Sequence, residues 1–107
     1  MTEVLDYLDD ILEAVEKIER FTEGMDYAEF VEDSKTVDAV LRNFEVIGEA
    51  AKNVPEEIRR EHSNVPWSEM AGMRDKLIHG YATVELRIVW TTVQEEIATL
   101  ASQIESI

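Results

Sequence analysis

The stretch 73–81, MRDKLIHGY, places an arginine, a histidine and a tyrosine close together. Arg74 is followed by His79 after five positions and by Tyr81 after two more, and the chain has only two histidines. An imidazole titrates near neutral pH, so it can serve as a general acid or base. The stretch is therefore either an ordinary helix end with a basic cap or a catalytic group at the edge of a binding surface.

The spacing of Arg74 and His79 limits how they can share a site. On one straight helix their side chains would point about 140° apart and lie about 7.5 Å apart along the axis. Gly80 offers one solution, because the chain can turn there and bring Tyr81 round after the last helical turn. A twofold axis offers another, because it would place His79 of one subunit near Arg74 of a second.

A purely structural interpretation of the same residues remains open. The helix dipole favours a basic residue such as His79 at a helix C-terminus, while Arg74 can be a surface charge and Tyr81 a packed ring. Asp75 favours a functional interpretation, because it lies four residues before His79 on the same helix face. From there its carboxylate could accept a hydrogen bond from the imidazole and orient it.

The net charge of −14 disfavours binding of nucleic acid through a broad basic surface. The acidic side chains are unevenly distributed, however. Residues 1–33 hold twelve acidic against two basic side chains, whereas residues 34–92 hold nine against eight. The first segment is typical of a solvated helix face. The segment that carries the motif is nearly neutral, so a small local anion site remains compatible with the composition.

Length and composition indicate one domain in a soluble, cytoplasmic protein. A chain of 107 residues can enclose one core, and we expect a single domain over residues 1–107. The absence of cysteine excludes disulfides and thiol chemistry. No apolar run approaches about 18 residues, and the acidic N-terminus MTEVLDYLDD is unlike a signal peptide.

Apolar residues at spacings of three and four predict a first helix that ends before Gly24. Its buried stripe is predicted to be Val4, Leu8, Ile11, Val15 and Ile18, widened by Leu5 and Leu12. Gly24 ends the helix, since glycine accepts the left-handed conformation that follows many helix C-termini. Asp26 and Glu29 then have the spacing of a capping box and open a short second helix.

A third helix is predicted over about residues 36–53, followed by a turn that starts at Pro55. Its buried stripe is predicted to be Val37, Val40, Leu41, Phe44, Ile47 and Val54. Gly48 lies inside this helix at a cost of about 1 kcal/mol relative to alanine. We therefore expect Gly48 to allow the close approach of another helix.

Two further helices complete the predicted fold. The fourth begins at Pro66 or Trp67 and ends near Gly80, and Thr83 caps a last long helix. Their buried positions are predicted to be Met70, Met73, Leu77 and Ile78, and then Leu86, Val89, Trp90, Val93, Ile97, Leu100 and Ile104. No segment alternates apolar and polar residues, so no strand is expected. The prediction is an all-α, antiparallel bundle of four to five helices.

The pattern Arg-x4-His-x-Tyr, present as 74-RDKLIHGY-81, resembles the signature of the HEPN superfamily. The resemblance is strongest to the HepT-like toxins of MNT–HEPN toxin–antitoxin pairs of bacteria and archaea. The stretches 41-LRNFEVIGEAAKNVP-55 and 83-TVELRIVW-90, with the turn at Trp67, extend it over most of the chain. It implies a HEPN-like helical fold and a homodimer, with higher assembly left open, in which two copies of the motif face a shared cleft.

The resemblance further implies a metal-independent ribonuclease toxin, with no cofactor. His79 would act as acid or base on the ribose 2′-hydroxyl or the leaving 5′-oxygen, and Arg74 would hold the scissile phosphate. Tyr81 would be the residue to which a nucleotidyltransferase antitoxin attaches AMP. Asp75 departs from the family pattern, in which a neutral polar residue often follows the arginine. Its carboxylate would repel phosphate unless it engages His79 or Arg74.

A di-metal site in the helical bundle is not supported by the sequence. Such a site needs Glu-x-x-His pairs, and basic residues stand three positions before both His62 and His79. Glu45 and Glu49 share a helix face, where a structural or solvated role is favoured. His62 is interpreted as an exposed residue at a helix end.

A non-enzymatic function is the main alternative. The chain would then be a helical module that binds a nucleotidyltransferase partner and presents a nucleotide or nucleic-acid surface without cleavage. The acidic first segment would suit docking to a basic partner as well as it suits a nuclease. Loss of RNA cleavage on changing His79 would separate the two functions, because a binding module would be indifferent to the change.

Overall fold

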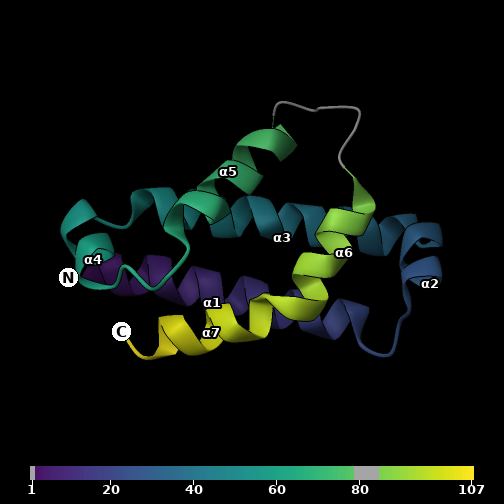
Figure 1. Cartoon of the computed structure of the whole chain (residues 1–107), viewed down its shortest axis with the longest axis horizontal. Helices are drawn as coiled ribbons and strands as arrows, with labels where there is room; N and C mark the ends of the chain where they lie inside the picture. The colour runs from purple at the N-terminus through teal and green to yellow at the C-terminus, as the bar shows by residue number, and fades with distance from the viewer. Residues whose placement is uncertain (1, 79–84) are drawn as a thin grey trace.

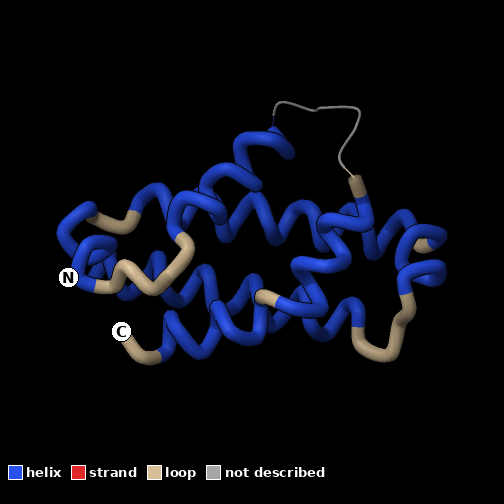
Figure 2. Tube along the Cα trace, in the orientation of Figure 1, coloured by secondary structure: helices blue, strands red, loops and turns tan. Residues whose placement is uncertain are grey.

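The computed structural model describes residues 2–78 and 85–107, which form seven helices and no strand (Figures 1 and 2). The helices are α1 (Thr2–Thr22), α2 (Tyr27–Glu32), α3 (Ser34–Asn53), α4 (Glu56–Glu61), α5 (Trp67–Ile78), α6 (Leu86–Glu95) and α7 (Ile97–Glu105). The all-α class is confirmed. The predicted number of helices is too low, because the turn after Pro55 forms α4 and the last predicted helix is divided in two. None of the described helices has the length and apolar character needed to cross a membrane.

The helices α1 and α3 lie side by side and run in opposite directions (Figure 1). α1 ends two residues before Gly24, whose φ of 76° lies in the left-handed region expected for it. The Asp26 side chain accepts a hydrogen bond from the backbone N–H of Glu29 at 2.8 Å, and the Glu29 side chain accepts one from the backbone N–H of Asp26 at 3.0 Å. The predicted capping box therefore starts α2.

The predicted apolar stripes of α1 and α3 form the core between these two helices. The side chains of Ile11, Val15, Ile18, Val40 and Ile47 are almost fully buried. The stripe of α1 is narrower than predicted, because 61% of the Leu5 surface is exposed at its edge.

The last predicted helix is divided at Glu96 into α6 and α7. The backbone there has φ of −120° and ψ of −32°, which departs from helical values, and the two helices meet at an angle (Figure 1). α6 packs on α2, whereas α7 packs on α1. The bend lets one apolar stripe follow both supports, with Val89 buried in α6 and Ile97 and Leu100 buried in α7. Thr83, the predicted cap of this helix, lies outside the described residues.

Two aromatic contacts hold α6 against α2. Phe30 is fully buried, and its ring centroid lies 5.0 Å from that of Trp90. The guanidinium of Arg87 lies 4.1 Å from the centroid of the Tyr27 ring, a cation–π contact. Together these pairs fix the first turns of α6.

Trp67 fixes the start of α5. Its side chain is buried, and its Nε1 donates a hydrogen bond of 3.0 Å to the carbonyl oxygen of His62 at the end of α4. From α7, the Gln103 side chain donates a hydrogen bond of 2.8 Å to the carbonyl oxygen of Asn64 in the same loop. Trp67 is therefore a packing residue, and α5 starts from an anchored loop.

The helices α3 and α5 are in close contact at Gly48. A Cβ at this position would overlap the Cβ of Arg74 and lie 2.7 Å from the carbonyl oxygen of Met70. Gly48 is buried. The prediction that Gly48 permits the close approach of another helix is confirmed, and that helix is the one that carries the motif arginine.

Gly48→Ala is expected to destabilise the fold by about 1–3 kcal/mol, because the new methyl group would force α5 away from α3. In an unobstructed helix the same change stabilises by about 1 kcal/mol. Gly72→Ala in α5 is the matched control, since nothing lies within 4 Å of a Cβ built there. Urea denaturation measures both variants. A Gly48→Ala protein as stable as the Gly72→Ala protein would contradict the close contact.

Candidate active site

The structure places two of the four predicted site residues. Arg74 and Asp75 are neighbours in the C-terminal half of α5. His79 and Tyr81 lie outside the described residues. Their predicted roles, and the predicted orientation of the His79 ring by Asp75, therefore stay predictions.

Arg74 points toward α3, where Gly48 makes room for it. The Cβ and Cγ atoms of Arg74 are the side-chain atoms nearest to Gly48. The side chain of Arg74 is 24% exposed, so its guanidinium is neither fully solvated nor sealed in the core. The aliphatic stem is thus held by helix packing, and the charged end is left at the edge of α3.

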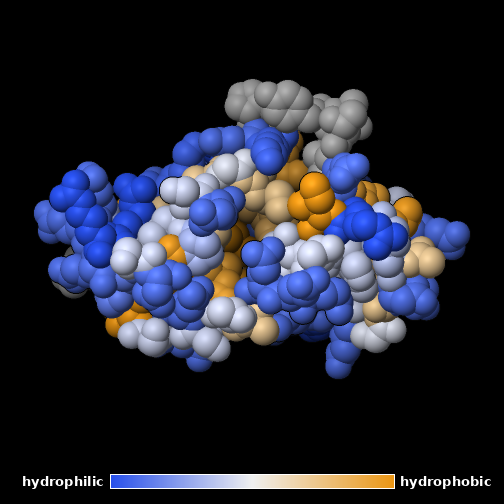
Figure 3. Space-filling view, in the orientation of Figure 1, coloured by the Kyte–Doolittle hydropathy of each residue, from blue (hydrophilic) through white to orange (hydrophobic). Residues whose placement is uncertain are grey.

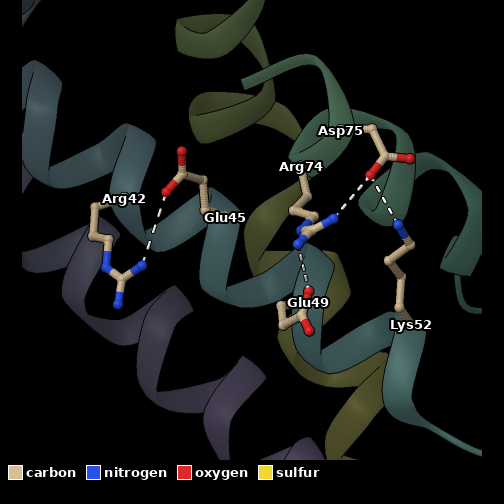
Figure 4. Close-up of polar contacts among 6 residues, drawn as sticks. All are labelled: Arg42, Glu45, Glu49, Lys52, Arg74 and Asp75. Carbon is tan, nitrogen blue, oxygen red and sulfur yellow. Dashed lines mark hydrogen bonds and ion pairs between the residues drawn. The ribbon is translucent and has the colours of Figure 1, made fainter. Parts of the chain in front are cut away.

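Four charged side chains join α3 to α5 around Arg74, and we refer to Glu49, Lys52, Arg74 and Asp75 as the charged network (Figure 4). Arg74 Nη2 lies 2.9 Å from Glu49 Oε2, and Arg74 Nη1 lies 3.2 Å from Asp75 Oδ1. Lys52 Nζ lies 2.9 Å from the same Asp75 oxygen. Two cations therefore face two anions, and their formal charges cancel.

The charged network answers the question that Asp75 raised in the sequence. The hydrogen bond from Lys52, followed by that from Arg74, lowers the pKa of the Asp75 carboxyl below its ordinary value of 3.8. Asp75 is therefore ionised at neutral pH, and two cations balance its charge. Of the two engagements that would offset repulsion of phosphate by Asp75, the one with Arg74 is present, and Lys52 adds a partner that the sequence did not suggest.

An open pocket of about 250 Å³ lies beside the charged network. Arg74 and Glu49 line one part of it, Arg42 and Glu45 line another part on α3, and Tyr7 contributes from α1. Arg42 and Glu45 form a looser pair, with Nη1 and Oε2 3.8 Å apart (Figure 4). The Arg74 guanidinium can therefore be reached from solvent through this pocket.

Sequence reasoning missed Glu49 and Lys52 as partners of the motif. It gave Glu49 a structural or solvated role and gave Lys52 none. The available signal was Gly48, because a small residue marks where another helix crosses α3. Glu49 and Lys52 follow it by one and four residues, so they lie beside that crossing.

His62, Met70 and Met73 lie at a helix end, in the core or against the core. His62 is the half-buried C-cap of α4. Met70 is buried in the core, and Met73 packs against the core. Within residues 2–78 and 85–107, no group of three or more acidic or histidine side chains is arranged as a metal site would require.

Comparison with known proteins gives a family model and relatives that are all named as ribonucleases. The family model described as "Ribonuclease HepT-like" matches residues 11–107, which include the charged network and the whole motif. A protein of Thermococcus cleftensis named "Probable ribonuclease HepT" is 50% identical over 102 residues, covering 95% of this chain and 93% of that protein. A candidate RNase of Caldanaerobacter subterraneus is 46% identical over 101 residues, covering 94% of this chain and 90% of that protein. A candidate RNase of Methanocaldococcus jannaschii is 45% identical over 101 residues, covering 94% and 84%. No solved structure matches the chain significantly.

Asp75→Asn is expected to lower stability near neutral pH and to have no effect in acid. A carboxyl whose folded pKa is depressed stabilises the fold above its unfolded pKa, and this contribution is lost as the pH falls through the folded pKa. For Asp75 the folded pKa lies below 3.8. Thermal denaturation of wild type and variant from about pH 7 to about pH 2.5 measures the difference in Tm.

Lys52→Gln is the companion variant for this experiment. The hydrogen bond from Lys52 lowers the Asp75 pKa more than any other contact does. Removal of Lys52 should therefore produce a Tm difference with the same pH dependence. A Tm difference for Asp75→Asn that persisted unchanged below the folded pKa would show that the ion pairs are not its source.

Proposed function

Since this chain belongs to the HepT-like ribonuclease family, we propose that it is the toxin of a toxin–antitoxin pair and cleaves RNA without a metal ion. Family membership makes the chain a ribonuclease by homology and confirms the resemblance seen in the sequence. The proposal assigns the reaction to Arg74 and His79 at a site shared by two subunits. The observation that carries it is the position of the Arg74 guanidinium, held by two carboxylates at the wall of an open pocket.

The proposed reaction uses the ribose 2′-hydroxyl as the nucleophile. The 2′-oxygen attacks phosphorus while the bond from phosphorus to the 5′-oxygen breaks, which leaves a 2′,3′-cyclic phosphate and a 5′-hydroxyl. One proton leaves the 2′-hydroxyl and one is delivered to the leaving 5′-oxygen; His79 makes one of these transfers and solvent water makes the other. Arg74 binds the non-bridging oxygens and stabilises the charge that develops on them. No step in this sequence needs a metal.

Helix geometry supports the proposal of a shared site. Arg74 turns toward α3, and a continuous helix would point a side chain five residues later about 140° away. The proposed contact surface for a second copy lies where α5 faces α6 and α7. There a cavity of about 120 Å³ is lined by Phe44, Met73 and Leu100 among other residues, and 57% of the surface of Ile88 is exposed in α6. Figure 3 shows hydrophobic side chains gathered in the hollow between α5 and α6.

The proposed antitoxin is a nucleotidyltransferase that transfers AMP from ATP to the Tyr81 hydroxyl and releases pyrophosphate. Tyr81 lies two residues after His79, so a modification there would fill the same cleft. The added phosphodiester would carry a negative charge within reach of Arg74. It would occupy the guanidinium that the RNA phosphate needs and so stop cleavage.

One observation favours a non-catalytic binding module as the second candidate. Arg74 already contacts two carboxylates, and the charged network has no formal net charge to attract a phosphate. A module of this kind would bind the nucleotidyltransferase and would not cleave RNA. RNA cleavage by the wild type that is lost in the Arg74 and His79 variants separates the candidates, and mixing the two inactive variants tests the shared site.

We expect single-stranded RNA to be cleaved in buffer containing EDTA, and both Arg74→Ala and His79→Ala to reduce the rate by about 10²–10⁴-fold. Mixed dimers of the two variants should recover part of the wild-type activity. One of their two shared sites would have Arg74 and His79 intact, while the other would lack both. Full loss of wild-type activity in EDTA that Mg²⁺ restores would contradict the metal-free mechanism. Mixed dimers without activity would place each site within one subunit.

Co-expression with a cognate nucleotidyltransferase is expected to add one or more AMP masses to the chain. Tyr81→Phe should abolish the addition, because it removes the accepting hydroxyl group. Intact-mass spectrometry of the two proteins makes the comparison, with Tyr27→Phe as a control that removes a hydroxyl from α2. An undiminished adduct on Tyr81→Phe would place the modification on another residue.

A further inference from the structure

Glu49 contacts the motif arginine directly. Its Oε2 lies 2.9 Å from Arg74 Nη2, and its side chain is 54% exposed on the pocket side of α3 (Figure 4). Glu49 follows Gly48 directly, so the residue that admits α5 also sets the carboxylate beside the guanidinium. No role in RNA cleavage is required of Glu49 by the proposed reaction itself.

The Arg74 guanidinium is anchored at both of its terminal nitrogens. Glu49 holds Nη2, and Asp75 holds Nη1 at 3.2 Å. A guanidinium has five N–H donors in one plane, so these contacts leave further donors for a phosphate. Because the plane is already oriented before substrate arrives, Arg74 does not have to be ordered during the reaction.

We propose that Glu49 is a positioning residue for RNA cleavage, acting through Arg74; this inference rests on the proposed ribonuclease function. The carboxylate fixes the direction of the guanidinium and does not touch the substrate. It also cancels one positive charge of the charged network. Loss of the Glu49 charge therefore misaligns Arg74 while making the network formally positive, so kcat falls and KM does not rise.

Two other roles for the Glu49–Arg74 contact predict different results. If Glu49 were a blocking anion that phosphate must displace from Arg74, its removal would raise kcat/KM. If Glu49 only stabilised the α3–α5 packing, its removal would lower Tm without a selective change in kcat. Kinetic and stability measurements on one variant therefore separate the three roles.

Glu49→Gln and the matched control Glu45→Gln form the test. Glu45 lies one turn earlier on α3 and lines the same pocket, but it forms its ion pair with Arg42. Both variants remove one negative charge from the same surface. We expect Glu49→Gln to lower kcat for a single-stranded RNA by about 10–100-fold without raising KM, and Glu45→Gln to change kcat by much less than this.

A second background shows whether Glu49 acts through Arg74. The Arg74→Lys variant has no planar guanidinium for Glu49 to orient. In this background, Glu49→Gln should change kcat by much less than it does in the wild type. A full additional loss of kcat in the Arg74→Lys background would overturn the positioning role.

Guanidinium NMR gives a readout that does not depend on RNA cleavage. Rotation of the Arg74 guanidinium, followed by its ¹⁵Nη signals, should be slow in the wild type and Glu45→Gln and faster in Glu49→Gln. Equal rotation in all three proteins, or equal kcat for the two glutamine variants of a cleaving enzyme, would overturn this inference alone. Absence of RNA cleavage by the wild type would overturn the proposed function and the positioning role of Glu49 together.

Discussion

The contact between α3 and α5 at Gly48 determines where the motif arginine lies. Any side chain at this position would overlap the Arg74 Cβ and press on the backbone of Met70. Because the helices meet this closely, a guanidinium on α5 reaches a carboxylate on α3, and Asp75 reaches Lys52 23 residues earlier in the chain. A wider helix spacing would lengthen both contacts and leave Arg74 with Asp75, on its own helix, as its remaining partner in the charged network.

The rest of the fold supports α5 at this distance. Trp67, the first residue of α5, is hydrogen-bonded to the end of α4. Gln103 of α7 is hydrogen-bonded to the loop that precedes α5. On the far side of residues 79–84, the pairs Phe30–Trp90 and Tyr27–Arg87 fix α6 to α2. The helix before the segment that carries His79 and Tyr81 and the helix after it are therefore both anchored, and some of the contacts that anchor them join residues distant in the sequence.

Local rules of sequence predicted much of this fold, and longer-range geometry was harder to predict. Gly24 and the Asp26 capping box follow from backbone preferences of single residues, and Gly48 from its cost inside a helix. The bend at Glu96 leaves no trace in the apolar pattern, because the spacing of three and four continues through it. The Glu49–Arg74 pair depends on the distance between two helices, and the spacing of residues within one helix does not predict that distance.

The charge balance of the site bears on how an acidic protein can act on RNA. The chain carries a net charge of −14, and the charged network around Arg74 sums to zero, so neither attracts a polyanion strongly. An oriented guanidinium instead interacts most favourably when extra negative charge develops on the phosphate oxygens, as it does in the proposed transition state. Stronger ground-state attraction would tighten RNA binding without raising kcat. In the proposed mechanism, a neutral network with a fixed Arg74 would favour the transition state over bound RNA, so the acidic α1 would not conflict with nuclease activity.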